Sequence, residues 1–130
     1  MGYRSDVMAV FYTHDITEYP AIKLFIDENM PEFFKGNFEE GSDYMSTFST
    51  TKGLRGVKFN IPSVKWYPSY PEVRQFEQAL EKFKELSAEV DSKWCCEFVR
   101  VGEEVEDIEE YQSYNAENLI YVSRTIESDV

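Results

Sequence analysis

Residues 57–83 read VKFNIPSVKWYPSYPEVRQFEQALEKF, and this stretch decides the fold because it joins a strand-like run to an amphipathic helix. Val57, Phe59 and Ile61 alternate with polar residues, which is the period of a strand with one buried face. Pro62 interrupts the run, and a proline inside a strand predicts an edge position or a bulge. The first half of the stretch therefore predicts a strand that leads through a turn into a helix.

The second half of the stretch predicts that helix. Apolar residues recur three and four positions apart over residues 73–90, which places them along one stripe of a helix surface. Ser69 stands three residues before Glu72, the spacing of a capping box, and Pro71 suits the first helical turn. We expect the stripe to pack on a sheet; a partner-binding face is the alternative interpretation.

The remaining elements follow from the same patterns in a chain of 130 residues, the length of one domain covering residues 1–130. Short runs rich in β-branched and aromatic residues predict strands, and an apolar stripe that ends before Pro31 predicts a first helix. The expected strands are residues 7–12, 44–51, 57–61, 94–101 and 119–126, and the expected helices are residues 17–30 and 71–90. This order predicts an α+β fold, ferredoxin-like β-α-β-β-α-β with an extra C-terminal strand, and helices on one face of a mostly antiparallel sheet.

Composition excludes several classes of protein. An apolar content of 42% with 16% aromatic residues argues against disorder, and no apolar run approaches the ~20 residues of a membrane span. Cys95 and Cys96 are adjacent, so in a strand their side chains point to opposite faces and form no mutual disulfide. His14 is the one histidine, which argues against a structural zinc site. We expect no metal and no cofactor.

Catalytic motifs are also missing from the sequence. His14 beside Asp15 has the chemistry of a general base, but no motif places a nucleophile or a second base near it. No predicted helix N-terminus lies beside Cys95 or Cys96 to activate a thiolate, and no glycine-rich phosphate-binding motif is present. We therefore expect that the protein is not an enzyme.

Negative charge is concentrated at the C-terminal end of the chain. The net charge is −12, and residues 91–130 hold 11 acids against 3 bases while residues 1–90 hold 14 against 10. The densest run places six carboxylates within eight residues: Glu103, Glu104, Glu106, Asp107, Glu109 and Glu110. Such a surface repels nucleic acids and anionic membranes and attracts basic proteins. The run is either a solvated loop or a partner-binding surface that imitates a phosphate backbone.

A second set of residues suggests a different kind of site. Aromatic side chains can stack on a base, and cationic side chains can hold its phosphates. The residues that could form such a pocket are Arg4, Lys65, Trp66, Tyr67, Arg100 and Arg124. If they gather, the alternative function is a small-molecule sponge that sequesters a nucleotide signal.

Four blocks of the sequence resemble a group of small acidic phage and prophage proteins of unassigned function. The blocks are GYRSDV at residues 2–7, VKWY-x-SY-x-EV at 64–73, RVGEE-x-x-DIEE at 100–110 and YVSRTIE at 121–127. The resemblance transfers no catalytic or ligand residue. It implies a phage-encoded accessory protein in the cytoplasm of an infected bacterium.

Together with the charge, the resemblance suggests a function. We expect an anti-defence or inhibitory protein, acting as a DNA mimic, that binds a host factor through its acidic C-terminal surface. The host factor would be a nucleic-acid-binding enzyme or a defence complex with a basic groove. We expect no direct contact with nucleic acid or membrane, and the sequence leaves homo-oligomers open.

Overall fold

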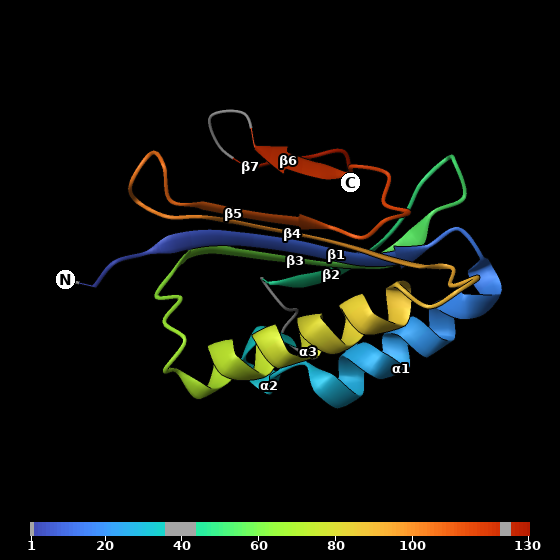
Figure 1. Cartoon of the computed structure of the whole chain (residues 1–130), viewed down its shortest axis with the longest axis horizontal. Helices are drawn as coiled ribbons and strands as arrows, with labels where there is room; N and C mark the ends of the chain where they lie inside the picture. The colour runs from blue at the N-terminus through green and yellow to red at the C-terminus, as the bar shows by residue number, and fades with distance from the viewer. Residues whose placement is uncertain (1, 36–43, 123–125) are drawn as a thin grey trace.

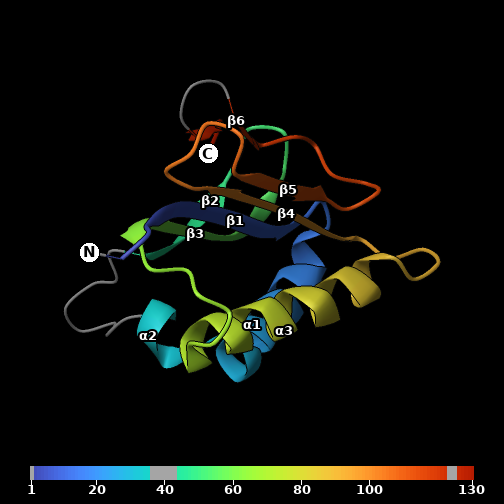
Figure 2. The same ribbon diagram turned by 60° about the vertical axis from the view of Figure 1, so that its left-hand side comes forward.

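The computed structural model describes residues 2–35, 44–122 and 126–130, which form three layers (Figure 1). Helices cover one face of a five-stranded sheet, and a two-stranded hairpin lies over the other face (Figures 1 and 2). The strands are β1 Ser5–Thr13, β2 Met45–Ser49, β3 Arg55–Val64, β4 Trp94–Val101, β5 Ile108–Gln112, β6 Ile120–Val122 and β7 Ile126–Ser128. The helices are the 3-10 turn η1 Ile16–Glu18, α1 Tyr19–Asn29, the short α2 Glu32–Lys35 and α3 Pro71–Ser87.

The structure confirms the α+β class, the antiparallel sheet and the placement of the helices on one face. The strand order is β2-β3-β1-β4-β5, which differs from the predicted layout because the strand added to the sheet is not the C-terminal one. The fifth strand, β5, comes instead from the acidic run, where residues 108–112 pair with β4. Residues 119–126 were expected as one strand, but they contribute to β6 and β7, a separate hairpin; residues 123–125 lie outside the described ranges.

The main core lies between the sheet and the helices. Alternate residues of β1 and β4 face the helices, so Phe11 and Phe98 are buried there together with Cys96. The ring of Phe11 meets the ring of Phe83 from α3 edge-to-face at a centroid distance of 4.9 Å. The apolar stripe of α3 is therefore packed on the sheet, as its spacing predicts. Phe76 belongs to the same cluster and lies 6.4 Å from Phe98, ring to ring.

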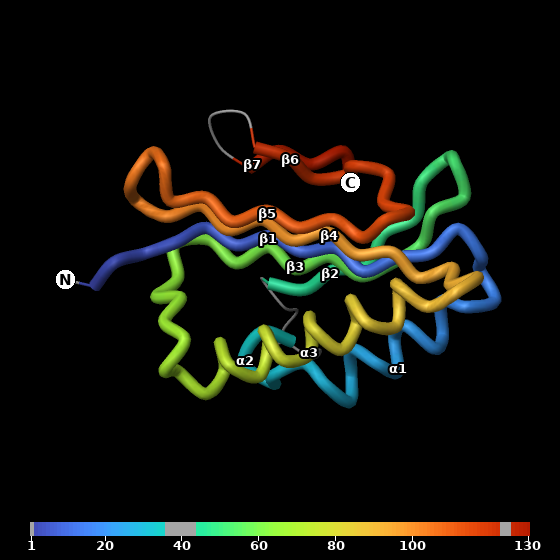
Figure 3. The backbone as a smooth tube through the Cα atoms, in the orientation of Figure 1, coloured from blue at the N-terminus to red at the C-terminus, as the bar shows by residue number. Residues whose placement is uncertain are grey.

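The strand β3 carries a bulge at its proline, one of the two outcomes that the sequence predicts. β3 is an interior strand between β2 and β1, and its register against β1 shifts between the pairs Ser5–Val64 and Val7–Ile61. Ser63, directly after the proline, has a φ of 51°. The backbone trace in Figure 3 follows β3 out of the sheet and into the turn that leads to α3.

The predicted capping box is absent. The helix α3 begins at Pro71 with Tyr70 as its N-cap residue, and no side chain caps it. Tyr70 has extended backbone angles, so the helix begins one residue later than a Ser69 cap requires. Pro71 occupies the first helical turn as predicted, where its missing N–H costs nothing.

A second apolar layer explains the C-terminal hairpin. Met8, Val10 and Val99 point away from the helices, and Leu119 and Ile120 cover them. A buried carboxylate joins the sheet to the C-terminal hairpin. Glu97 is fully buried and accepts hydrogen bonds from Tyr12 Oη at 2.6 Å and from Ile120 N at 3.1 Å. Buried polar groups are stable only when they are hydrogen-bonded, so these bonds fix the C-terminal segment on the sheet.

Candidate partner-binding site

The site is the loop between β4 and β5, residues 102–107, which we term the acidic loop. It lies at the end of the sheet where the N-terminal segment also lies (Figure 1). Its backbone closes on itself, because Gly102 N donates to the Asp107 carbonyl at 2.8 Å and Asp107 N donates to the Glu104 carbonyl at 3.0 Å. The loop therefore has a defined hydrogen-bonded frame and is not simply a solvated connection.

The base of the acidic loop is held by an arginine. Arg100 is 9% exposed, and its guanidinium donates to both oxygens of Asp107, at 2.5 and 3.1 Å. It also donates to Glu109 Oε1 at 2.8 Å from Nη2 and at 3.0 Å from Nε, and to Ser5 Oγ at 3.0 Å. We term these residues the Arg100 cluster. Two of the six predicted partner-binding acids are thus neutralised by the protein's own arginine.

The cluster changes the titration of its members. The hydrogen bonds from Arg100, and next from the Tyr3 hydroxyl, lower the pKa of Asp107 from 3.8 to about 2. The hydrogen bond to Asp107 raises the pKa of Arg100 above its ordinary value, with Glu109 adding to the effect. Asp107 is therefore a carboxylate, and Arg100 a cation, throughout the physiological pH range.

The N-terminal segment fixes the loop from the other side. The Tyr3 hydroxyl donates to Asp107 Oδ2 at 2.6 Å and accepts from Glu104 N at 3.0 Å. The bond to Asp107 is the main cause that raises the pKa of Tyr3. The backbone N–H of Arg4 donates to Glu103 Oε1 at 2.9 Å. The loop is thus tied to a segment that is about a hundred residues away in the sequence.

Gly102 is required by this arrangement. A Cβ atom at this position would overlap the Asp107 carboxylate and the Tyr3 hydroxyl. Both groups are hydrogen-bonded to each other, so they cannot move aside without breaking that bond. The glycine therefore allows the close approach that builds the base of the loop.

The remaining acids point outward. Glu103, Glu104 and Glu106 are exposed, and between them Val105 is 91% exposed. The side chains of Glu104 and Glu106 bind no residue in the part of the chain that the structure describes. Glu110, in β5, is exposed as well. The predicted run is therefore two sets of carboxylates, one held inside the Arg100 cluster and one directed to solvent.

The predicted nucleotide-binding residues are not brought into one pocket. Arg4 and Lys65 border a surface hollow of about 590 Å³, which Glu103 also lines. Trp66 is only 7% exposed and belongs to the main core, where its Nε1 donates to Glu77 at 3.2 Å.

The other predicted ligand residues have internal roles. Tyr67 Oη accepts from Tyr3 N at 2.7 Å, and Arg100 is saturated by the acids of its cluster. Arg124 lies outside the described residues. Of the five that the structure describes, Arg4 and Lys65 line one hollow together.

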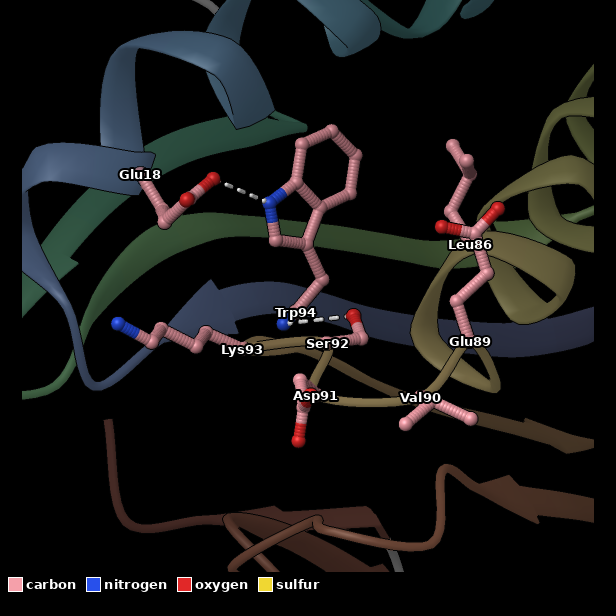
Figure 4. A pocket seen from close by; sticks show the side chains of 8 residues that line it. All are labelled: Glu18, Leu86, Glu89, Val90, Asp91, Ser92, Lys93 and Trp94. Atoms are coloured by element: carbon pink, nitrogen blue, oxygen red, sulfur yellow. Dashed lines mark hydrogen bonds between the residues drawn. The ribbon is translucent and has the colours of Figure 1, made fainter.

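A separate hollow lies at the turn between α3 and β4, and it offers no reactive arrangement (Figure 4). It measures about 330 Å³ and includes Glu18, Lys93 and Trp94. Trp94 Nε1 donates to Glu18 at 3.0 Å, and Lys93 pairs with Asp15 at 2.9 Å. The polar groups of Glu18, Lys93 and Trp94 are thus engaged in structural contacts.

The cysteines and the histidine have structural surroundings. Burial raises the pKa of the Cys95 thiol to about 12 and that of the Cys96 thiol to about 11, so neither is a thiolate near neutral pH. His14 Nε2 lies 3.1 Å from Glu117 Oε1 on the surface.

Among the described residues, no three His, Cys, Asp or Glu side chains are grouped as metal ligands. In the same ranges, no helix combines the length and the apolar character that crossing a membrane requires.

Comparison of the chain with protein families, curated proteins and solved structures found no match. The site therefore rests on its own geometry. Sequence reasoning found the acids but missed Tyr3, Ser5 and Gly102, which position them. Tyr3 and Ser5 lie about a hundred residues before the acidic loop, so no pattern within either segment indicates that the two meet.

Proposed function

We propose that this protein binds and inhibits a host factor with a basic surface, using the acidic loop as the contact. The observation that carries the proposal is the outward set of Glu103, Glu104 and Glu106 on a loop whose base is fixed by the Arg100 cluster. The resemblance to phage and prophage proteins supplies the setting, an accessory protein in the cytoplasm of an infected bacterium. A nucleic-acid-binding enzyme or a defence complex would present the required basic groove.

The fixed frame supports a binding role for the loop. A loop that is already ordered loses less conformational entropy when it binds, and more of the contact energy then contributes to affinity. Tyr3 and Arg100 hold this loop before any partner arrives. The net charge of −12 accelerates encounter with a positive surface, an effect that weakens as salt is added.

Carboxylates on a fixed loop also support a DNA-mimic mode of inhibition. Basic grooves bind the phosphates of nucleic acid by neutralising a row of negative charges. Three outward carboxylates on one loop offer such a row, while Val105 adds an apolar contact at its centre. Competition by DNA for the same partner is therefore an expected property of the complex.

The test is capture of partners from nuclease-treated bacterial lysate with matched charge variants. The loop variant carries Glu103→Lys, Glu104→Lys and Glu106→Lys, and it leaves Asp107 in place because that residue holds the loop. The control carries Asp27→Lys, Glu28→Lys and Glu85→Lys, which make the same change of charge on exposed helical positions. We expect the wild type and the control to retain a partner that the loop variant loses and that duplex DNA displaces. Equal capture by all three proteins contradicts the proposal.

Sequestration of a nucleotide signal is the second candidate function, and it is now restricted to the hollow beside Arg4 and Lys65. Glu103 at the same hollow opposes an anionic ligand. A thermal-shift panel of nucleotides tests this candidate, because a ligand at 100 times its Kd adds about 2.7 kcal/mol of stability. If no nucleotide raises the melting temperature, this second candidate function is excluded.

A further inference from the structure

The outer edge of β5 is the feature that carries an inference beyond the acidic loop. Two backbone bonds define its ladder with β4: Ser113 N donates to the Cys96 carbonyl at 2.9 Å, and Gly102 N donates to the Asp107 carbonyl at 2.8 Å. Opposed residues of an antiparallel pair alternate between bonded and non-bonded positions. Both of these pairs are bonded, so every second pair between them is bonded as well.

The register then shows which groups of β5 face outward. Arg100 and Glu109 form a bonded pair, whereas Val99 and Glu110 form a non-bonded pair. The N–H and C=O of Glu110 therefore point away from β4, and the same holds for Gln112. Within the described ranges β5 is the last strand of the sheet, and no group bonds the backbone of Glu110. This edge has the hydrogen-bonding groups that an added strand requires.

A groove runs along this edge on the helix side. It measures about 590 Å³ and lies between α3 and β5. Leu80, Phe98 and Tyr111 give it an apolar floor. Its charged side chains are three acids and one base, Glu77, Glu81, Glu109 and Lys84, whereas Glu110 opposes Val99 and directs its side chain to the other face of the sheet. The groove is therefore apolar below and acidic at its rim.

The single base of the groove is already engaged. Lys84 Nζ lies 2.9 Å from Glu81 Oε1 and 4.0 Å from the centre of the Tyr111 ring. Arg100, which neutralises Glu109, is also occupied by Asp107. A peptide in the groove would therefore meet a negative rim, with Glu110 exposed beside the open backbone.

The negative charge along the β5 edge favours one kind of binding partner over the others. A second copy of the chain that paired β5 with β5 about Glu110 would oppose like carboxylates, which destabilises a strand pair. Nucleic acid is repelled by the same charges. An extended segment with basic side chains is attracted, and the side chains of a strand alternate between its two faces. Every second residue of such a segment would enter the groove beside Glu81 and Glu109.

We propose that the β5 edge accepts an extended basic segment of the partner protein as a sixth strand, with Lys or Arg at alternate positions in the α3–β5 groove. This inference rests on the proposed function in so far as it assigns the segment to the basic host partner. It adds the mode of recognition: backbone pairing at Glu110 and charge pairing at the rim.

The experiment uses the full-length protein and a synthetic eight-residue peptide of alternating lysine and valine. Two further peptides are N-methylated, one at every lysine amide and one at every valine amide. An added strand directs one of these two amide sets toward β5, so we expect one methylated peptide to bind about tenfold more weakly and the other to bind like the parent. Equal binding of all three peptides overturns strand addition, because charge alone would then explain the affinity.

Protein variants give a second readout. Glu110→Pro removes the outward N–H and should weaken the parent peptide about tenfold, whereas Glu110→Gln removes only the charge and should weaken it less. Circular dichroism confirms that each variant is folded. Equal affinities of the two variants overturn the inference, as does a wild-type protein that dimerises through β5.

The outcomes separate this inference from the proposed function. If the partner is captured through the acidic loop but N-methylation leaves the affinity of the peptide unchanged, strand addition alone is overturned. If the loop variant captures the partner as well as the wild type does, the proposed function fails, and the peptide result decides strand addition by itself.

Discussion

The two halves of the acidic run make a comparison within seven residues of one chain, 103–109. Asp107 and Glu109 are bound by Arg100, a residue that is itself 9% exposed, whereas Glu103, Glu104 and Glu106 point to solvent. The residue types are the same, and the difference comes from register, because β5 places Glu109 directly opposite Arg100. Carboxylates next to an arginine stabilise the fold. Of the other three, Glu104 and Glu106 have exposed side chains, and Glu103 is exposed while one of its oxygens accepts from the Arg4 N–H.

The largest expected effect comes from removing the arginine. Arg100→Met leaves Asp107 and Glu109 close together without their counter-charge, so we expect the free energy of unfolding to fall by about 2–3 kcal/mol. Urea denaturation measures this change. Lys93→Met is the control, because it removes an ion pair with Asp15 that lies on the surface. A loss from Arg100→Met no larger than that from the control contradicts the structural half of the comparison.

The next effect is a pH dependence. The folded-state pKa of Asp107 is about 2 and its ordinary value is 3.8, so its ionised form stabilises the fold. This stability is fully present above about pH 4 and is lost as the pH falls toward 2. Asp107→Asn removes it, and we expect the gap in melting temperature between wild type and variant to close over this window. A gap that stays constant from pH 5 to pH 2 contradicts the role of Asp107.

The loop glycine gives a smaller, local effect. Gly102→Ala places a methyl group against the Asp107 carboxylate and the Tyr3 hydroxyl. We expect the bond between them to break, with a lower melting temperature and altered amide signals in residues 102–107 by NMR. Gly53→Ala is not a matched control because its φ is +87°, whereas Lys52→Ala changes an exposed side chain in another turn. Unchanged amide signals in the loop would show that the close approach is unimportant.

The smallest expected effect on stability is that of the outward acids. The variant Glu103→Lys, Glu104→Lys, Glu106→Lys should change the free energy of unfolding by no more than about 0.5 kcal/mol per position, because exposed charges contribute little. Urea denaturation beside the Arg100→Met variant makes the comparison direct. A loss as large as that of Arg100→Met would mean that both halves of the run are structural.

Local periodicity explains what could be predicted from the sequence. The strand at residues 94–101 was predicted with the bounds that β4 has, and Cys95 and Cys96 lie on its opposite faces as predicted. The helices over 17–30 and 71–90 were also found close to their predicted places. These features depend on neighbouring residues, so a single sequence contains them.

Long-range pairing explains what could not be predicted. An acid-rich stretch has low strand propensity, yet residues 108–112 form β5 because Arg100 and Phe98 offer partners for Glu109 and Tyr111. The C-terminal residues left the sheet because a second apolar face had to be covered. The roles of Tyr3 and Gly102 depend on contacts across the chain, which spacing within a segment does not reveal.

The central claim is that outward carboxylates, and not those of the Arg100 cluster, bind the partner. The most direct measurement is the affinity of the captured and purified host protein for three proteins at pH 7: wild type, Glu103→Gln/Glu104→Gln/Glu106→Gln, and Asp107→Asn. We predict that the triple variant binds about tenfold more weakly with a reduced salt dependence, while Asp107→Asn binds within about threefold of wild type. An affinity lost with Asp107→Asn and kept by the triple variant would contradict the account.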